Sequence, residues 1–491
     1  MHDEPLPNVV SMPEAEPERL NIEASEDALA LEYATRYKDI MRYEGYRSRW
    51  FKWGGSRWEI DHKLVAYSLS RSLVREISGK IQDAAIKNDL ADLPVTAIAR
   101  DKATARRKAK SRARTIIRPM RSAKTIHAIV SLARSDVKLS ADFRQWDADE
   151  WLLNTPEGTI DLRDGSMRSH RVRDYITKSC TVSPEYAPPT LWLQFLDEVT
   201  QGSADMISYL QRMLGYCLTG TTKDHALFYA WGRGQNGKTT ILETVGFILG
   251  DYWIESPPQA FIATNESRHE TEIARMHNVR LVTSDELPQG KEWDTSKVKR
   301  LTGGSTVSAR FMRQDYFEFE PQFKLLMAGN DKPSLRYVDD AIRRRFHLIP
   351  FTHRVPDHKK DRDLGHKLQD EAPRILSWMI EGCLAWQSSG LQPAQSVRDA
   401  TDDYLAGEDS MTSWFEECCG KDQGCFESTT DLFQSWASWA RANEEYVGSR
   451  KNFSQQLSAR APLYGLTKQK TRTSNGFGGL ELLKSVKSPS P

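Results

Sequence analysis

Residues 226–249 read ALFYAW (226–231), GRGQNGKT (232–239) and TILETVGFIL (240–249). The first part is an apolar run typical of a buried strand, the second matches G-x-x-x-x-G-K-[ST], and the third has helical apolar spacing. A strand, a glycine loop and a helix in this order form the phosphate-binding loop of nucleotide-binding α/β domains. The flanking strand and helix argue against an accidental glycine loop, so we expect a bound nucleotide here.

The residues of this loop have distinct expected roles. Lys238 is expected to reach the β- and γ-phosphates, and the Thr239 hydroxyl is expected to ligate Mg²⁺. The glycines let successive backbone N–H groups curl around the phosphates, and the positive end of the helix faces the same anion. The candidate nucleotide-binding residues are Gly232, Gly234, Gln235, Asn236, Gly237, Lys238, Thr239 and Thr240.

Two further apolar segments end in polar side chains. VRLVTSDE (279–286) ends in two acids and FKLLMAGN (323–330) ends in an amide. Parallel strands bring such side chains to the same sheet edge as the phosphates. We expect Asp285 to hold Mg²⁺, Glu286 to polarise the attacking water, and Asn330 to orient that water and sense the γ-phosphate. Taken alone, each has an ordinary alternative as a solvated strand end or a turn former.

Three consecutive arginines precede the next apolar segment, in DDAIRRRFHLIPF (339–351). A solvated basic turn is the ordinary alternative. Clustered cations repel one another unless an anion binds near them. A γ-phosphate bound by a neighbouring subunit would be such an anion. We name Arg344 and Arg345 as candidate catalytic arginines acting in trans, although the sequence does not distinguish among Arg343, Arg344 and Arg345. Such a finger implies a ring of subunits.

The segment 297–321 between the acids and Asn330 is basic and aromatic. Residues 306–310 and 316–320 are expected to pair as a hairpin around a polar tip. A hairpin of this composition can line a pore and grip a nucleic-acid strand, and an ordinary surface hairpin is the alternative. The candidate contacts to DNA phosphates or nucleotide are Lys299, Arg310 and Arg313.

The order of these motifs resembles superfamily 3 DNA helicases, and more closely their phage/plasmid primase–helicase branch, which is related to the poxvirus-type NTPase. The matching segments are 232–239 for motif A, 280–286 for motif B, 299–304 with the following hairpin for motif B′, 324–330 for motif C, and Arg344-Arg345 for the arginine-finger region. The resemblance implies ATP and Mg²⁺ as cofactors. It also implies a hexameric ring that translocates 3′ to 5′ on single-stranded DNA during replication.

The chain departs from the family pattern in two ways. Ser305 stands where the family often has an acid, and the N-terminal region shows no D-x-D-type metal pair before a histidine. No primase active site is therefore expected. The expected partners are single-stranded and forked DNA, further copies of the chain, and a separate primase or other replication proteins.

Composition sets the broad class. The 491 residues are too many for one core, and 68 basic against 67 acidic residues leave nucleic-acid binding to local clusters. The six cysteines lack metal-site spacing. No signal peptide or membrane-spanning run is evident, so we expect no membrane partner and a location in the cytoplasm of a bacterial host.

We therefore expect an α/β fold with an AAA+-like P-loop NTPase core of the superfamily 3 helicase type. A mixed, largely helical N-terminal domain and a C-terminal winged-helix-like domain would flank that core. The expected boundaries are 1–25 for a disordered tail, 26–186 for the N-terminal domain, 187–395 for the helicase/ATPase domain with a helical collar, and 408–491 for the C-terminal domain.

Two N-terminal segments stand out. Residues 28–86 are rich in aromatics around a predicted Gly54-Gly55 turn, which favours a small core over base stacking. Residues 100–124 carry eleven basic residues and one acidic residue. This segment is a candidate to bind DNA or an acidic partner, and a solvated helix face is the alternative.

The C-terminal segment predicts two helices followed by a Gly-tipped hairpin, as in a winged helix. A structural cap or a protein-docking module is the alternative. Its expected positive face comprises Lys451, Arg460, Lys468, Lys470 and Arg472.

The favoured function is an ATP-dependent DNA helicase in the replication of a phage, prophage or plasmid. An origin-binding initiator, whose ATPase switches assembly without processive unwinding, is the alternative. A third hypothesis is a non-replicative NTPase in packaging or defence.

Overall fold

The computed structural model describes residues 24–483, except 263–269, 285–292, 313–314, 334, 336–337, 357, 359, 444, 446 and 471–473. The fold is mixed α/β, and its contacts divide the chain into two units between Trp146 and Asp147. Among the described residues, no helix is both long and apolar enough to cross a membrane. Residues 1–23 of the predicted tail and the segment that carries Asp285 and Glu286 lie outside the described residues.

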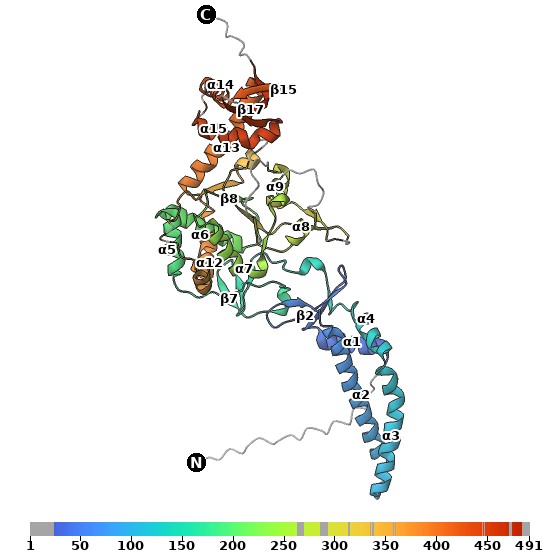
Figure 1. Ribbon diagram of the computed structural model, residues 1–491. Helices are drawn as coiled ribbons and strands as arrows, with labels where there is room; N and C mark the ends of the chain where they lie inside the picture. Colours follow the sequence, from blue (N-terminus) through green and yellow to red (C-terminus); the bar gives the residue numbers. More distant parts are fainter. Residues whose placement is uncertain are drawn as a thin grey trace, which may run out of the picture. The chain divides into compact units, whose positions relative to one another are not determined.

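The N-terminal unit combines four helices with a small sheet (Figure 1). Its elements are α1 (Glu26–Tyr37), β1 (Met41–Glu44), β2 (Arg49–Trp53), β3 (Trp58–Ile60), α2 (Val65–Ala91), α3 (Ala99–Met120), α4 (Ala123–Ala133) and β4 (Ser140–Ala141). The sheet order is β3-β2-β1-β4, with β4 parallel to β1 and the other pairs antiparallel.

The aromatic residues of this unit form a core. Tyr33, Trp50, Phe51 and Trp58 are buried, and Trp50 and Tyr33 meet edge to face. The predicted turn at Gly54-Gly55 joins β2 to β3, where Trp53 pairs with Trp58. The predicted small core is confirmed for these residues, because burial leaves no ring face free for a base.

The second unit is built around a five-stranded, all-parallel sheet in the order β14-β8-β13-β10-β9. The strands are β8 (Leu227–Trp231), β9 (Trp253–Glu255), β10 (Leu281–Ser284), β13 (Lys324–Gly329) and β14 (Phe346–Pro350). The apolar run predicted at 226–231 is β8, which lies between β14 and β13 inside the sheet. Strands buried on both faces read as continuous apolar runs, which explains that sequence.

The two faces of this sheet carry separate apolar cores, because successive side chains of a strand point to opposite faces. Phe228 and Ala230 join one core with α5 (Thr190–Thr200), α6 (Ala204–Leu218), α7 (Lys238–Leu249) and α12 (Ala372–Ser389). Leu227 and Tyr229 join the other core. That second core includes α9 (Thr295–Thr302), a hairpin of β11 (Val307–Ala309) and β12 (Phe317–Phe319), and the middle of α13 (Gln395–Cys418).

The remaining elements of the second unit flank this sheet. An antiparallel sheet of β5 (Leu152–Asn154), β6 (Thr159–Asp161) and β7 (Ser166–Arg168) precedes it. Short helices α8 (Glu270–Arg275), α10 (Asp340–Arg343) and α11 (Leu364–Asp370) lie between its strands or follow them. After α13 come β15 (Cys419–Ser428), α14 (Thr429–Ala442), α15 (Arg450–Tyr464), β16 (Thr467–Lys470) and β17 (Asn475–Leu482). Strands β15, β17 and β16 form an antiparallel sheet in that order.

Candidate nucleotide site

The loop 232–237 leaves β8 at the carboxyl edge of the parallel sheet and enters α7. A Cβ atom at Gly232 would lie 1.9 Å from the Phe351 carbonyl oxygen, so this position accepts only glycine. Gly237 has φ +84° and would place a Cβ 2.7 Å from Val199. The strand–loop–helix order predicted from the sequence is present. A close backbone contact requires glycine at 232, and positive φ together with close side chains favours glycine at 237.

Lys238 is buried at the start of α7. Its ammonium donates hydrogen bonds to the Gly232 carbonyl oxygen at 2.5 Å, Asn236 Oδ1 at 3.0 Å and Asn330 Oδ1 at 3.4 Å. Asn236 Nδ2 in turn donates to the Phe351 carbonyl oxygen at 2.7 Å. The lysine is therefore held across the loop, with its charge next to Asn330, the residue that follows β13.

Of the two predicted polar strand ends, the one that carries Asn330 lies beside the loop, as the sequence analysis expected. Gly329 at the end of β13 pairs with Trp231 at the end of β8, so Asn330 starts beside the loop. Ser284 ends β10 at the same edge, and the predicted Asp285 and Glu286 follow it outside the described residues. Thr239 lies exposed on the first turn of α7, and Thr240 follows it. The structure thus brings Lys238 and Asn330 together.

Two groups that shape the loop were missed by the sequence analysis. Arg354 Nε donates to Gln235 Oε1 at 2.8 Å, and the Val355 amide donates to the Gln235 carbonyl oxygen at 3.0 Å. Phe195 of α5 lies 3.0 Å from the position of a Gly237 Cβ, under the loop. Nothing in the local sequence around Phe195 pointed to this loop.

The arginines lie at the opposite edge of the sheet. The Arg345 carbonyl oxygen accepts from the Leu227 amide at the start of β8. The Arg345 guanidinium is 7% exposed, donates to Thr302 Oγ1 at 3.3 Å and to the Ala341 carbonyl oxygen at 2.7 Å, and burial lowers its pKa. Arg343 and Arg344 are exposed. Five strand residues, about 16 Å, therefore separate this region from the loop of the same chain.

The predicted hairpin is present as β11 and β12, which pair antiparallel from Val307–Phe319 to Ala309–Phe317. Arg310 is exposed and lies over the Tyr316 ring, 4.8 Å from its centroid. Met312 and Tyr316 near the tip are 77% and 51% exposed. Lys299, on α9, is paired with Asp339, and Arg313 lies outside the described residues.

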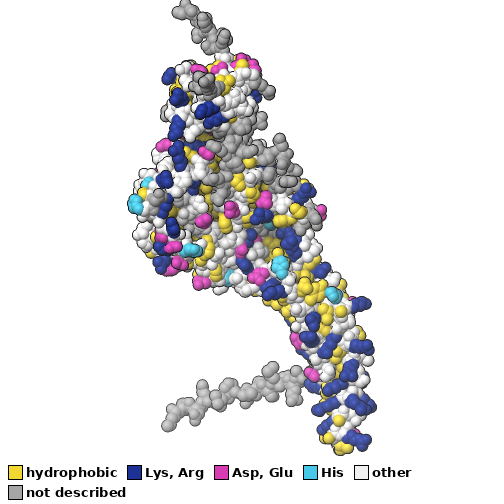
Figure 2. All heavy atoms as spheres, viewed as in Figure 1, with side chains coloured by type: hydrophobic (Ala, Val, Ile, Leu, Met, Phe, Trp, Pro, Cys, Tyr) yellow, Lys and Arg dark blue, Asp and Glu magenta, His cyan; other side chains and the backbone are white. Residues whose placement is uncertain are grey.

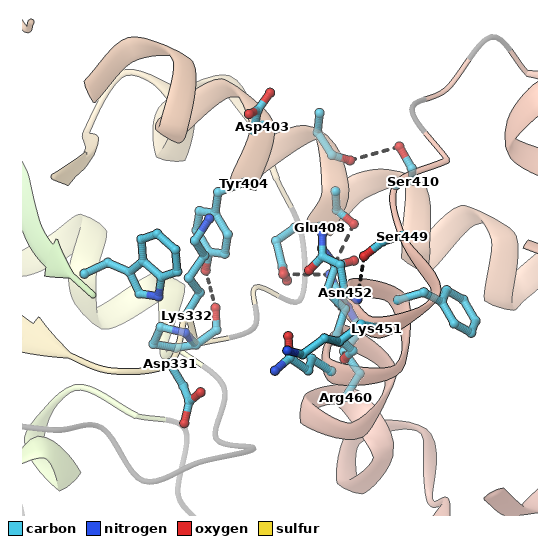
Figure 3. A pocket seen from close by; sticks show the side chains of 18 of the residues that line it. Asp331, Lys332, Asp403, Tyr404, Glu408, Ser410, Ser449, Lys451, Asn452 and Arg460 are labelled. Atoms are coloured by element: carbon cyan, nitrogen blue, oxygen red, sulfur yellow. Dashed lines mark hydrogen bonds and ion pairs between the residues drawn. The ribbon is translucent and has the colours of Figure 1, made fainter. Parts of the chain in front are cut away.

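A cavity of about 730 Å³ lies beside the loop, between the carboxyl edge of the sheet and the C-terminal elements (Figure 3). Its walls include Gly232, Asn330 and Lys332, together with residues of α13 and α15. The Lys332 ammonium lies 4.4 Å from the Trp231 ring centroid, and burial lowers the pKa of Lys332. The cavity thus borders both Asn330 and the C-terminal elements.

Arg460 corrects one expectation for the C-terminal segment. It was predicted on a positive face, but it is 1% exposed and forms a 2.7 Å ion pair with buried Glu408. Lys451, Lys468 and Lys470 are exposed as expected, and Arg472 lies outside the described residues. The charge of Arg460 is therefore paired inside the molecule. Local sequence reasoning could not identify its acidic partner, because that partner lies on α13.

Two family models match the chain. One, "D5 N terminal like", matches residues 30–201, and a second, a family of unknown function (DUF5906), matches residues 230–345. A putative helicase of Acanthamoeba polyphaga mimivirus is 24% identical over 364 residues, which cover 67% of this chain and 37% of the relative. The primase D5 of fowlpox virus is 24% identical over 220 residues, covering 41% of this chain and 27% of the relative. The chain is therefore similar to D5-type primase–helicase proteins.

These similarities confirm the resemblance found in the sequence. A putative helicase of frog virus 3 is 25% identical over 308 residues, 58% of this chain and 31% of the relative. The chain thus spans about a third of the length of these curated D5-type relatives. Among solved structures, the apo C-terminal region of NrS-1 aligns over 93% of this chain and 99% of that chain, with 10% identity and a TM-score of 0.44.

Proposed function

We propose that the protein is a DNA-stimulated ATPase that acts as a DNA helicase in the replication of a mobile element. One observation carries this proposal: Lys238 at the start of α7 and Asn330 directly after β13 meet at the mouth of a glycine loop. The relatives named putative helicase and primase D5 support the replication role. The strand order around β8 supports an AAA+-like P-loop core.

The residues around the loop fit ATP·Mg²⁺. The glycine backbone and the first turn of α7 offer N–H groups to phosphate oxygens, and Lys238 adds a charge that reaches the γ-phosphate side. Thr239 and Asp285 would hold Mg²⁺, which would neutralise charge developing on the phosphates. Glu286 would accept a proton from the attacking water while Asn330 orients it.

The position of the arginines supports a site completed by a neighbour. Arg344 is exposed at the amino edge of the sheet, about 16 Å from its own loop, so it would serve the loop of an adjacent subunit. Arg345 would hold that segment in place through Thr302. Repetition of one such contact closes into a ring, and the resemblance favours a hexamer.

DNA contacts would come from the hairpin and the C-terminal elements. Arg310 and Tyr316 at the hairpin tip offer a cation and an exposed ring to a single strand. Arg313, outside the described residues, stays a further candidate from the sequence. Hydrolysis would move this hairpin and draw the strand 3′ to 5′. The order α13-β15-α14-α15-β16-β17 is typical of a winged helix, with Lys451, Lys468 and Lys470 exposed.

Hydrolysis measurements test the proposal. We expect the full chain to release phosphate from ATP with Mg²⁺, faster with single-stranded DNA, and Lys238→Ala to reduce the rate at least 100-fold, ~3 kcal/mol of barrier. Arg171→Ala, at an exposed position away from the loop, is the matched control. An alanine variant at Lys238 with full activity would refute the assignment. Hydrolysis that ignores DNA would favour a non-replicative NTPase, and tight duplex-specific binding without unwinding would favour an origin-binding initiator.

A further inference from the structure

Helices α2 and α3 form a two-helix arm within the N-terminal unit (Figure 1). The buried face of α3 consists of small or apolar residues four positions apart, at Ala105, Ala109, Ala113 and Ile117. The buried residues of α2 lie between Ala66 and Ser78. A helix contact made mostly by alanines buries little apolar area. One narrow stripe of α3 therefore faces α2, and the other sides of α3 face solvent.

The solvent-facing sides of α3 are covered with positive charge. The helix carries nine basic side chains and one acid, Asp101, and all nine basic side chains are exposed. Figure 2 shows these side chains in dark blue along the arm, with little acidic surface between them. The nine are Arg100, Lys102, Arg106, Arg107, Lys108, Lys110, Arg112, Arg114 and Arg118.

The rest of the described chain does little to neutralise this charge. Among the described residues, Arg112 is the one basic side chain of α3 that forms an ion pair, with Asp89 of α2. Like charges one turn apart on a helix destabilise it. A helix with this composition is therefore suited to an anionic partner that brings many charges at once.

We propose that the α2–α3 arm is a binding surface for the phosphate backbone of duplex nucleic acid, without sequence preference. The 22 residues of α3 extend about 33 Å, close to one turn of B-DNA. Six of its nine basic residues are arginine, whose planar guanidinium group matches phosphate geometry. This surface lies outside the nucleotide site and does not depend on ATP hydrolysis.

An acidic protein is the less favoured partner because the surface lacks an apolar centre. Protein–protein interfaces usually combine charge at the rim with a buried apolar core. Within α3, Ile116 is the large apolar side chain that is exposed, and it is 48% exposed. Positive charge on several sides of a helix fits a polyanion that can wrap around the helix or lie along its length.

Salt-dependent binding tests the proposal with the full chain and no nucleotide. The probes are a labelled 30-bp duplex of arbitrary sequence, the matching single strand, and polyglutamate as an acidic polypeptide. We compare the parent with a fourfold variant, Arg106→Gln, Arg107→Gln, Arg114→Gln and Arg118→Gln. Each lost phosphate contact should reduce the slope of log K against log salt by ~0.9, so the fourfold change should reduce it by about 3 to 4.

Two matched variants separate charge from structure. Arg→Gln changes at Arg171, Arg173, Arg362 and Arg398, all exposed in the second unit, should leave the slope unchanged. Arg→Lys changes at the four arm positions should keep most of the duplex affinity. Unchanged duplex binding by the Arg→Gln arm variant, or loss confined to polyglutamate, would overturn the proposal. Equal loss in the Arg→Lys variant would also overturn it, because positive charge would then not explain the binding.

Discussion

Burial determines how individual charged side chains of this protein behave as much as their residue type does. Lys324 starts β13 and is 1% exposed, with its ammonium bonded to the Thr219 carbonyl oxygen and lying 4.7 Å from the Tyr216 ring centroid. Burial is the main cause that lowers the pKa of Lys324 to about 7, with Cys217 opposing this shift and neighbouring Arg280 contributing to it. The sheet thus holds a cation where most proteins place an apolar residue.

The lowered pKa of Lys324 predicts how stability depends on pH. Between about pH 7 and 10.5 the unfolded chain binds the proton and the folded chain does not, so the free energy of unfolding rises with pH in this window. We expect a gain on the order of 1–2 kcal/mol from pH 6.5 to 8.5, measured by denaturant unfolding. Lys324→Met should lose that gain. A variant with the parent's pH profile would contradict the prediction.

The glycine loop allows a test at one atom. Gly232→Ala would place a methyl group 1.9 Å from the Phe351 carbonyl oxygen, whereas a Cβ at Gly234 meets nothing within 4 Å. We expect Gly232→Ala to weaken nucleotide binding at least tenfold, ~1.4 kcal/mol, and Gly234→Ala to bind within a few fold of the parent. Fluorescent-nucleotide titration measures both. Equal behaviour of the two variants would contradict the described loop geometry.

Local sequence patterns correctly predicted residues that lie near the ends of their own strands. They failed for charged residues whose partners are distant in the sequence. Lys238 and Asn330 meet as expected, because parallel strands bring successive strand ends to one edge. Arg460 was read as exposed, but Glu408 from another helix buries it. Nothing in the residues around Arg460 identifies that partner, since ion pairs between helices depend on how the helices pack.

At the scale of elements, α13 connects the sheet domain to the C-terminal elements. Tyr404 and Leu405 belong to the core of the parallel sheet, and Met411 and Trp414 belong to the C-terminal core. The helices and the last hairpin of this region were predicted from their periodicity. Strand β15 was missed, because its sequence, CGKDQGCFES, is polar and glycine-containing.

The buried ion pair on α13 predicts a coupled stability change. Glu408 binds Arg460 and also accepts from the Leu335 amide at 2.7 Å, so removing the cation would leave a buried carboxylate without its charge partner. Arg460→Met should lower the free energy of unfolding by about 3 kcal/mol. Adding Glu408→Gln should recover part of that loss, because glutamine keeps an acceptor for Leu335. No recovery in the double variant would contradict the pairing.

At the scale of the whole molecule, the proposed ring predicts complementation between two inactive variants. Lys238→Ala removes the loop lysine and Arg344→Ala removes the proposed finger, so each variant alone should be inactive. In mixed rings, about a quarter of the interfaces would pair an intact loop with an intact finger from the neighbour. We expect partial ATPase recovery after mixing and reassembly. A mixture as inactive as its components would contradict a finger in trans.

The most direct test of the central claim is strand displacement by the full chain with ATP and Mg²⁺ on forked, 3′-tailed and 5′-tailed DNA. We predict unwinding of the forked and 3′-tailed substrates, little unwinding of the 5′-tailed one, and none by Lys238→Ala. Displacement of none of the three substrates while ATP hydrolysis remains intact, or displacement that requires a 5′ tail, would contradict the proposed 3′ to 5′ helicase.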